Sequence, residues 1–133
     1  MENSVTTECL YAYARVSTKG QKEDRQLEEF KKYGIPTDNI FVDKKSGKDF
    51  DREEYQFLKR ILKRSEGKNN VLFIHSIDRL GRNYNAIMEE WREITKDLKA
   101  NIVVLDMELL DTRRYKDLLG TFIADLVLQI FSL

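Results

Sequence analysis

The chain has 133 residues, of which 41% are apolar and 35% are charged, and its 23 basic and 23 acidic residues give zero net charge. This length and apolar share fit one folded domain and exclude an intrinsically disordered chain. The single cysteine excludes a disulfide framework and a multi-cysteine zinc site, and it fits a reducing compartment. Zero net charge is unusual for a nucleic-acid-binding protein, although it does not say where the charges lie.

Four short runs rich in β-branched or aromatic residues are spaced along the chain. They cover residues 9–14, 40–42, 71–74 and 102–105. The runs lack strict alternation of apolar and polar residues, as is typical of strands that are buried on both faces of a sheet. We therefore predict four strands at these positions.

Amphipathic helices are predicted after the first and second strands. The first helix contains Leu27 and Phe30 and stops at Gly34, because glycine commonly follows the last turn of a helix. The second begins with an acidic variant of the capping box at residues 51–54 and ends near Gly67. Its apolar positions are Tyr55, Leu58 and Leu62.

Two further helices are predicted after the third and fourth strands. Asn83 is the predicted N-cap of the third helix, and the last helix is predicted to begin near Tyr115. The apolar face of the third helix is formed by Ile87, Trp91, Ile94 and Leu98. The last helix has a very wide apolar face, formed by Leu118, Leu119, Phe122, Ile123, Leu126, Val127, Ile130 and Phe131.

The regular alternation of strands and helices predicts an α/β fold with three layers. We expect a mostly parallel sheet of about four to five strands in the order 2-1-3-4, with helices on both faces and a long C-terminal helix. No repeat, low-complexity segment or linker divides the chain. Ligands of such sheets bind beyond the carboxyl ends of the strands, where the strand order reverses.

For the order 2-1-3-4, the reversal lies between the first and third strands. Arg15 and Ser17 follow the first strand, and Arg79 and Arg82 follow the third. If Arg82 begins a helical turn, its guanidinium and that of Arg79 can face the same cleft. Guanidinium forks suit phosphate oxygens. A serine beside arginines, without a histidine–aspartate relay, suggests phosphoryl transfer through a covalent serine ester.

Ordinary structural roles compete with this interpretation. Ser17 and Thr18 also suit a helix N-cap, and Asp78 with Arg79 also suits a surface ion pair. The single histidine, His75, is more typical of a packed or hydrogen-bonded residue than of a metal ligand, because a metal site needs partners that are missing here. These roles leave the cluster of arginines at one switch point unexplained.

Four segments carry a family resemblance in the right order. The first reads YARVST and is followed by Gln21 and Gln26, and the last reads DRLGRN. The segments are residues 13–18, 43–47, 51–53 and 78–83. Together they resemble the signatures, the mobile loop and the following arginine segment of the serine recombinases, of the resolvase and invertase type.

The resemblance implies that Ser17 attacks a DNA phosphodiester, forms a 5′-phosphoserine link and releases a 3′-hydroxyl. It implies that arginines stabilise the phosphate, that Gln21 supports the nucleophile loop, and that Asp78 orients the arginines or takes part in proton transfer. The implied catalytic residues are Ser17, Arg15, Arg79, Arg82, Arg52, Asp78 and Gln21. The implied contacts to DNA phosphates are Arg15, Arg52, Arg79, Arg82, Lys44, Lys45 and Lys48.

The group that deprotonates Ser17 stays open between Asp78 and solvent, because arginine is a poor general base. The resemblance implies strand exchange in a tetramer built from homodimers, without metal or cofactor. Residues 1–115 are then the catalytic domain, and residues 116–133 begin a truncated oligomerisation helix, with no helix-turn-helix DNA-binding domain in the sequence. The expected oligomer interface is formed by Phe122, Ile123, Leu126, Val127, Ile130 and Phe131. We expect this chain alone to be inactive and to bind DNA weakly.

Two other functions compete with this one. A flavodoxin-like or receiver-like module for a phosphate-bearing ligand would share the topology, but the first turn lacks a glycine-rich phosphate loop. A metal-dependent nuclease would use strand-end carboxylates such as Asp43, Asp78 and Asp106, and metal dependence would identify it. The chain shows no signal peptide, and the apolar stretch 118–133 is too short for a membrane span, so we expect a cytoplasmic protein.

Overall fold

The computed structural model describes residues 7–16, 20–44, 52–107, 109–114, 125–126 and 128–130. Strands and helices alternate along it, as predicted. The strands are β1 (Cys9–Val16), β2 (Ile40–Lys44), β3 (Asn70–Ile74) and β4 (Asn101–Val104). The α-helices are α1 (Gly20–Lys32), α2 (Glu53–Arg64) and α3 (Tyr84–Arg92). Three short helices connect them: η1 (Thr37–Asn39), η2 (Ile77–Arg79) and the π-helical η3 (Glu93–Asp97), which continues α3.

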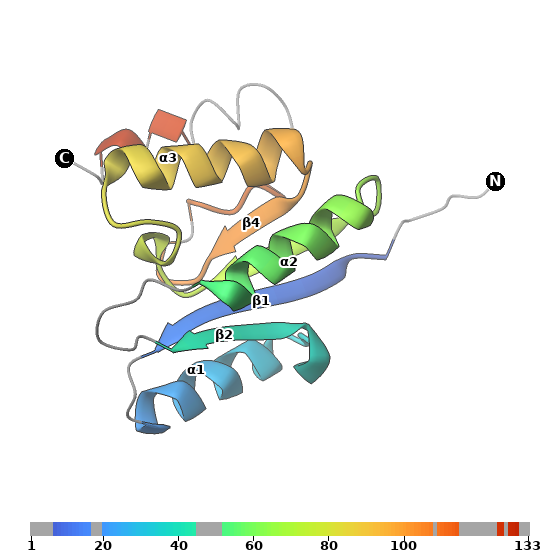
Figure 1. Ribbon diagram of the computed structural model, residues 1–133, viewed down its shortest axis with the longest axis vertical. Helices are drawn as coiled ribbons and strands as arrows, with labels where there is room; N and C mark the ends of the chain where they lie inside the picture. Colours follow the sequence, from blue (N-terminus) through green and yellow to red (C-terminus); the bar gives the residue numbers. More distant parts are fainter. Residues whose placement is uncertain are drawn as a thin grey trace.

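The four strands form one parallel sheet in the order β2-β1-β3-β4, which confirms the predicted order (Figure 1). The residues after β4 extend its outer edge in the antiparallel direction. There Val103 forms a bridge with Asp111, and the Val104 N–H donates to the Leu110 carbonyl at 3.0 Å. The four described strands are therefore all parallel, and one antiparallel bridge extends the sheet at the edge of β4.

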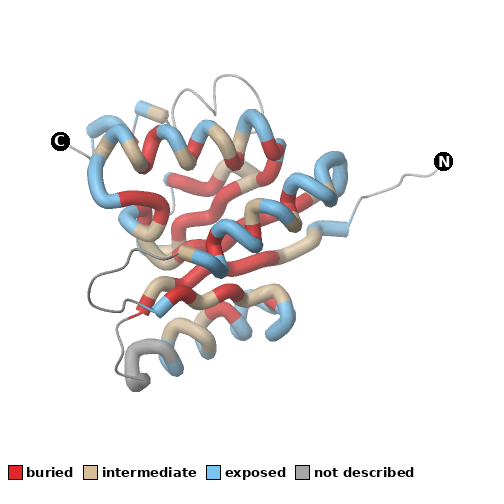
Figure 2. Tube along the Cα trace, in the orientation of Figure 1, coloured by how far each residue is buried: buried red, intermediate tan, exposed pale blue. Residues whose placement is uncertain are grey.

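Two α-helices, α2 and α3, cover one face of the sheet, and α1 covers the other. Alternate residues of β1 point to opposite faces, so that Tyr13 packs with α2 and α3, and Ala12 packs with Phe30 of α1. Figure 2 shows the buried positions along the strands and on the inward sides of the helices. The core on the α2 and α3 face also contains Leu128 from the C-terminal segment.

Two of the helix ends agree with the stop and cap residues predicted from the sequence. Gly34 follows α1 with a φ of 84°, a left-handed conformation that favours glycine, and the Ile35 N–H donates back to the Phe30 carbonyl at 3.3 Å. Asn83 caps α3, because its side-chain oxygen accepts from the Ala86 N–H at 2.9 Å. Both predictions are confirmed. The predicted start of the last helix near Tyr115 lies outside the described residues, whereas residues 125–126 and 128–130 are helical.

The predicted capping box at residues 51–54 is wrong. The N-cap of α2 is Arg52, whose side chain makes no capping hydrogen bond. The N–H groups of Glu54 and Tyr55, which have no partner within the helix, instead donate to the carboxylate of Asp43 at 3.0 and 3.1 Å. A carboxylate from the neighbouring strand thus satisfies the first turn of α2, which removes the need for a cap in the helix's own sequence.

Candidate active site

Polar side chains gather where β1, β2 and β3 end. The strands are parallel, so their carboxyl ends meet at one edge of the sheet, and Arg15 of β1 lies opposite Asp43 of β2 in the register. Ser17, the residue after β1, lies outside the described residues, as do Lys45 and Lys48. Lys44 ends β2 and is exposed, and Gln21 lies in the first turn of α1.

A cleft of about 570 Å³ opens at this edge, on the side of α2 and α3. It is lined by Arg15, Arg52, Leu80, Gly81, Arg82, Asn83, Asn85, Ala86, Glu89 and Glu90. We call it the arginine cleft. It brings together three of the predicted phosphate-binding residues, which come from β1, the start of α2 and the segment between η2 and α3. Because guanidinium groups bind phosphate oxygens through paired N–H donors, the cleft is suited to a phosphate group.

Arg52 is fixed in the arginine cleft by the protein itself. Its two terminal nitrogens donate to the carbonyls of Leu80 and Arg79 at 2.9 and 2.8 Å. Its guanidinium lies 3.9 Å from the ring centroid of Tyr55 and 5.6 Å from that of Tyr13. Arg52 therefore fastens the η2 segment to the start of α2, in addition to its predicted role toward a phosphate.

Asp43 organises the base of the cleft and was considered from the sequence only as a strand-end carboxylate. It is 6% exposed, and the Tyr13 hydroxyl donates to it at 2.7 Å, alongside the two N–H donors of α2. Burial, followed by this hydrogen bond, raises the pKa of Tyr13 well above its usual range. Three donors thus satisfy the buried carboxylate, which joins β1, β2 and α2 at this point.

A second polar network joins α2 to α3 beside the cleft. The Tyr55 hydroxyl donates to Glu90 Oε1 at 2.6 Å, and the Lys59 ammonium donates to the same oxygen and to Glu93, both at 2.9 Å. Burial, then the bond to Glu90, raises the pKa of Tyr55. Burial lowers the pKa of Lys59, but the bonds to Glu93 and Glu90 outweigh burial and raise it overall. Sequence reasoning missed this network, since Tyr55 reads only as a core position.

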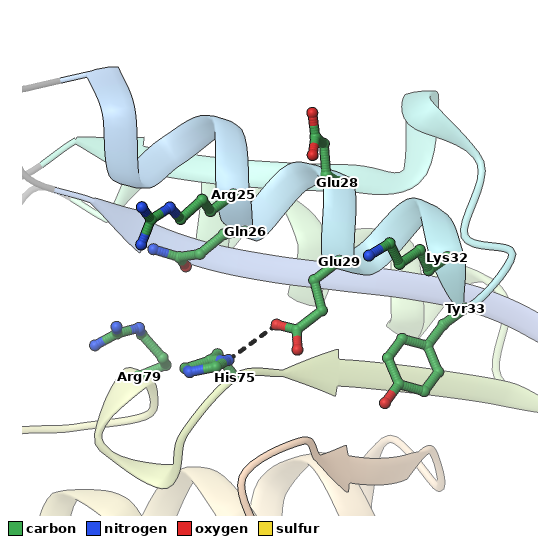
Figure 3. Close-up of a pocket in the computed structure, with 8 residues that line it drawn as sticks. All are labelled: Arg25, Gln26, Glu28, Glu29, Lys32, Tyr33, His75 and Arg79. Carbon is green, nitrogen blue, oxygen red and sulfur yellow. Dashed lines mark hydrogen bonds and ion pairs between the residues drawn. The ribbon is translucent and has the colours of Figure 1, made fainter.

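Arg79 and Arg82 lie in different pockets, which corrects the expectation that they face one cleft. Arg79 lines a pocket of about 730 Å³ between α1 and the end of β3, the α1 pocket, where it lies beside His75 and across from Arg25 and Gln26 (Figure 3). Its full lining is Arg25, Gln26, Glu28, Glu29, Lys32, Tyr33, His75 and Arg79. Arg79 ends the short helix η2, whereas Arg82 follows Gly81, so the chain turns between them.

Asp78 and His75 make local contacts. The Ser76 hydroxyl donates to Asp78, whose carboxylate also lies 3.4 Å from an Arg79 terminal nitrogen. The pair expected from the sequence between Asp78 and Arg79 is therefore present, and Asp78 is 67% exposed. His75 Nδ1 lies 3.1 Å from Glu29, which agrees with the hydrogen-bonded role that the sequence favoured over metal binding.

The remaining predicted residues concern oligomers, metals and membranes. Leu126 and Ile130 are exposed, whereas the other four residues of the expected oligomer interface lie outside the described part of the chain. Within the residues that the structure describes, no cluster of three metal-ligating side chains is present. The described helices also include none that is both long and apolar enough to cross a membrane.

Comparison with known proteins gives one family. Residues 10–130 match the family Resolvase, N terminal domain. The Transposon Tn3 resolvase of Escherichia coli is 41% identical over 73 residues, which are 55% of this chain and 37% of that protein. The R46 site-specific recombinase of Escherichia coli is 35% identical over 96 residues, which are 72% of this chain and 46% of that protein. The chain thus spans less than half of these relatives.

Two solved structures share the fold. The N-terminal catalytic domain of TP901-1 integrase superposes with a TM-score of 0.63 at 19% identity, over 94% of this chain and 93% of that one. A resolvase family site-specific recombinase from Streptococcus pneumoniae gives a TM-score of 0.57 at 23% identity, over 91% of this chain and 85% of that one. At these identities the similarity concerns the fold alone.

Proposed function

Because the chain belongs to the resolvase family, whose N-terminal domain it matches over residues 10–130, we propose that it is the catalytic domain of a serine site-specific DNA recombinase. The observation that carries this proposal is the arginine cleft, in which Arg15, Arg52 and Arg82 converge at the carboxyl edge of the sheet. Ser17 follows β1 in the sequence, two residues after Arg15. We therefore assign the nucleophile to the same edge of the sheet as the phosphate-binding guanidinium groups.

The proposed reaction exchanges one phosphate ester for another. The Ser17 hydroxyl oxygen attacks the phosphorus of a DNA phosphodiester while the bond between phosphorus and the 3′ oxygen breaks. The 3′ oxygen leaves with the bonding electron pair and takes a proton, which gives a 3′-hydroxyl and a 5′-phosphoserine link. The reverse attack by a 3′-hydroxyl rejoins DNA and restores Ser17. Since an ester replaces an ester, no high-energy cofactor is required.

The arginines supply charge stabilisation. Negative charge on the phosphate oxygens grows or spreads in the transition state, and fixed guanidinium groups stabilise it without reorganising. Arg52 is held by carbonyls and aromatic rings, so its orientation is set before a phosphate arrives. We assign direct phosphate contact to Arg15 and Arg82 and a shared contact to Arg52. Arg79 would join them by turning its side chain out of the α1 pocket.

The proposed acceptors of the Ser17 proton are Asp78 and solvent. Asp78 is a carboxylate on η2 and accepts from the Ser76 hydroxyl, so a hydroxyl group is already within its reach. Its exposure leaves it accessible to a second donor. The proposed partners are DNA and further copies of the chain, first in a dimer and then in a tetramer. The exposed apolar side chains of Leu126 and Ile130 are consistent with such a contact.

Covalent capture tests the proposal. The natural protein that contains this chain is incubated with fragmented DNA from its host, denatured and digested, and the DNA that stays attached is sequenced. Mass spectrometry is expected to find a nucleotide joined to Ser17 through its 5′-phosphate. Ser17→Ala is expected to abolish the attachment. Attachment that persists in Ser17→Ala, or cleavage that requires a divalent metal and leaves no adduct, would contradict the proposal.

A further inference from the structure

Two carboxylates line the arginine cleft together with its guanidinium groups. Glu89 is exposed, whereas the Glu90 side chain is only 18% exposed and faces the cleft from α3. A carboxylate next to arginines is a strong competitor for a phosphate, because both bind guanidinium through the same paired N–H donors. The position of Glu90 therefore matters for any phosphate that enters.

The Glu90 carboxylate is held by other donors. Its Oε1 accepts from the Tyr55 hydroxyl at 2.6 Å and from the Lys59 ammonium at 2.9 Å. Lys59 is anchored a second time, by Glu93 at 2.9 Å, and only 13% of its side chain is exposed. These contacts are short and partly buried, so they are worth more than a surface ion pair.

Tyr55 contacts both Arg52 and the Glu90 carboxylate. The guanidinium of Arg52 lies 3.9 Å from the centroid of the Tyr55 ring, while the hydroxyl of the same ring donates to Glu90. The Lys59 ammonium lies 5.0 Å from that centroid. Tyr55 is fully buried. The face of its ring thus orients Arg52, and its hydroxyl orients Glu90.

We propose that Lys59 is a positioning residue that holds the Glu90 carboxylate away from the guanidinium groups of the arginine cleft, so that Glu90 does not compete with a DNA phosphate. This inference rests on the proposed function, because it assigns a DNA phosphate to the cleft. Lys59 acts through Glu90 and does not itself contact the phosphate. Loss of Lys59 leaves a partly buried carboxylate that lines the same cleft as Arg15, Arg52 and Arg82.

The test measures binding of a fluorescent 20-base-pair random DNA duplex to the chain by anisotropy at low salt. Lys59→Met is expected to weaken binding about tenfold, or about 1.4 kcal/mol. Lys63→Met, one turn further along α2 and exposed, removes the same charge and is expected to weaken binding only about twofold. Adding Glu90→Gln to Lys59→Met is expected to restore binding to within about twofold of the unmodified chain.

Rescue by the double variant is the deciding result. If Lys59→Met with Glu90→Gln binds as weakly as Lys59→Met alone, Lys59 acts through its own charge and the proposal is wrong. Equal losses in Lys59→Met and Lys63→Met also overturn it. If Lys59→Met does not fold, Tyr55→Phe removes the other donor to Glu90 and is expected to weaken binding a few-fold, again with rescue by Glu90→Gln. Failure of the proposed function is distinguishable, because it removes the Ser17 adduct in the unmodified protein.

Discussion

The arginine cleft and the α1 pocket are built from similar residue types on opposite faces of the sheet, but they are held differently. In the cleft, Arg52 donates to two backbone carbonyls and packs against the Tyr55 ring at 3.9 Å. In the α1 pocket, side chains pair with side chains: His75 with Glu29 at 3.1 Å and Arg79 with Asp78 at 3.4 Å. The cleft is a fixed site, and the α1 pocket is held by surface pairs.

Burial makes the ion pair beside the arginine cleft stronger than the ion pair in the α1 pocket. Lys59 and Glu90 beside the cleft are 13% and 18% exposed, whereas His75 and Glu29 in the α1 pocket are 41% and 39% exposed. Water screens the exposed pair and lets its side chains move, so that it contributes little to folding. A guanidinium that is to stabilise a transition state gains from the buried arrangement, because its orientation is set in advance.

Removing Arg52 is expected to have the largest effect on the folded state. Arg52→Ala loses two charge-assisted hydrogen bonds and two cation–π contacts, and it should lower the free energy of unfolding by about 3 kcal/mol. Arg25→Ala in the α1 pocket, at an exposed position, should lower it by less than about 0.5 kcal/mol. Urea unfolding followed by circular dichroism measures both. Equal losses in the two variants would erase the distinction between the two pockets.

Gly81 tests how the chain divides its arginines between the two pockets. A Cβ at Gly81 would lie 2.7 Å from the Ala86 Cβ and 3.0 Å from both the Ala86 carbonyl carbon and the Ile87 nitrogen, so the first turn of α3 would have to move. Gly81→Ala should therefore cost about 2 kcal/mol and weaken DNA binding by shifting Arg82. Unfolding and duplex titration measure the two effects. Gly67→Ala serves as a control, because a Cβ there meets no atom within 4 Å, although its φ of 97° adds local strain.

The fold could be predicted almost completely because its signals are local. Strands such as 71–74 are uninterrupted apolar runs, and helix ends such as Gly34 and Asn83 carry their own backbone chemistry. The start of α2 was predicted wrongly because its N–H groups bond to Asp43, a residue 11 to 12 positions earlier on strand β2. A contact between elements leaves no periodic pattern in the sequence.

The candidate site could be predicted only in part, for the same reason. Arg15, Arg52 and Arg82 were assigned to one cleft through strand ends and motif resemblance, and they line it. Their supports could not be predicted, since Tyr55 and Glu90 meet only when α2 packs beside α3. The separation of Arg79 from Arg82 depends on a turn at Gly81, whose direction the spacing of three residues does not give.

The stability of the chain at alkaline pH should depend on Tyr13 and Tyr55, the tyrosines beneath the arginine cleft. Burial and acceptor carboxylates raise the pKa of Tyr13 and of Tyr55 above their ordinary value of about 10, so the folded chain keeps both protons where the unfolded chain loses them. Below pH 10 this stabilisation is fully present, and it is lost as the pH rises above 10. Each tyrosine should contribute a fall of about 1.4 kcal/mol per pH unit in the free energy of unfolding.

Tyr13→Phe and Tyr55→Phe isolate these contributions. Each variant removes one titrating hydroxyl while keeping the ring beside Arg52, so the slope of stability between pH 10 and 12 should become shallower by about 1.4 kcal/mol per pH unit. Both variants should also be less stable at neutral pH, because Asp43 or Glu90 loses a donor. A slope that neither substitution changes would mean that the phenols ionise without unfolding the chain. The polar network beneath the cleft would then be looser than its distances indicate, and the cleft would resemble the α1 pocket.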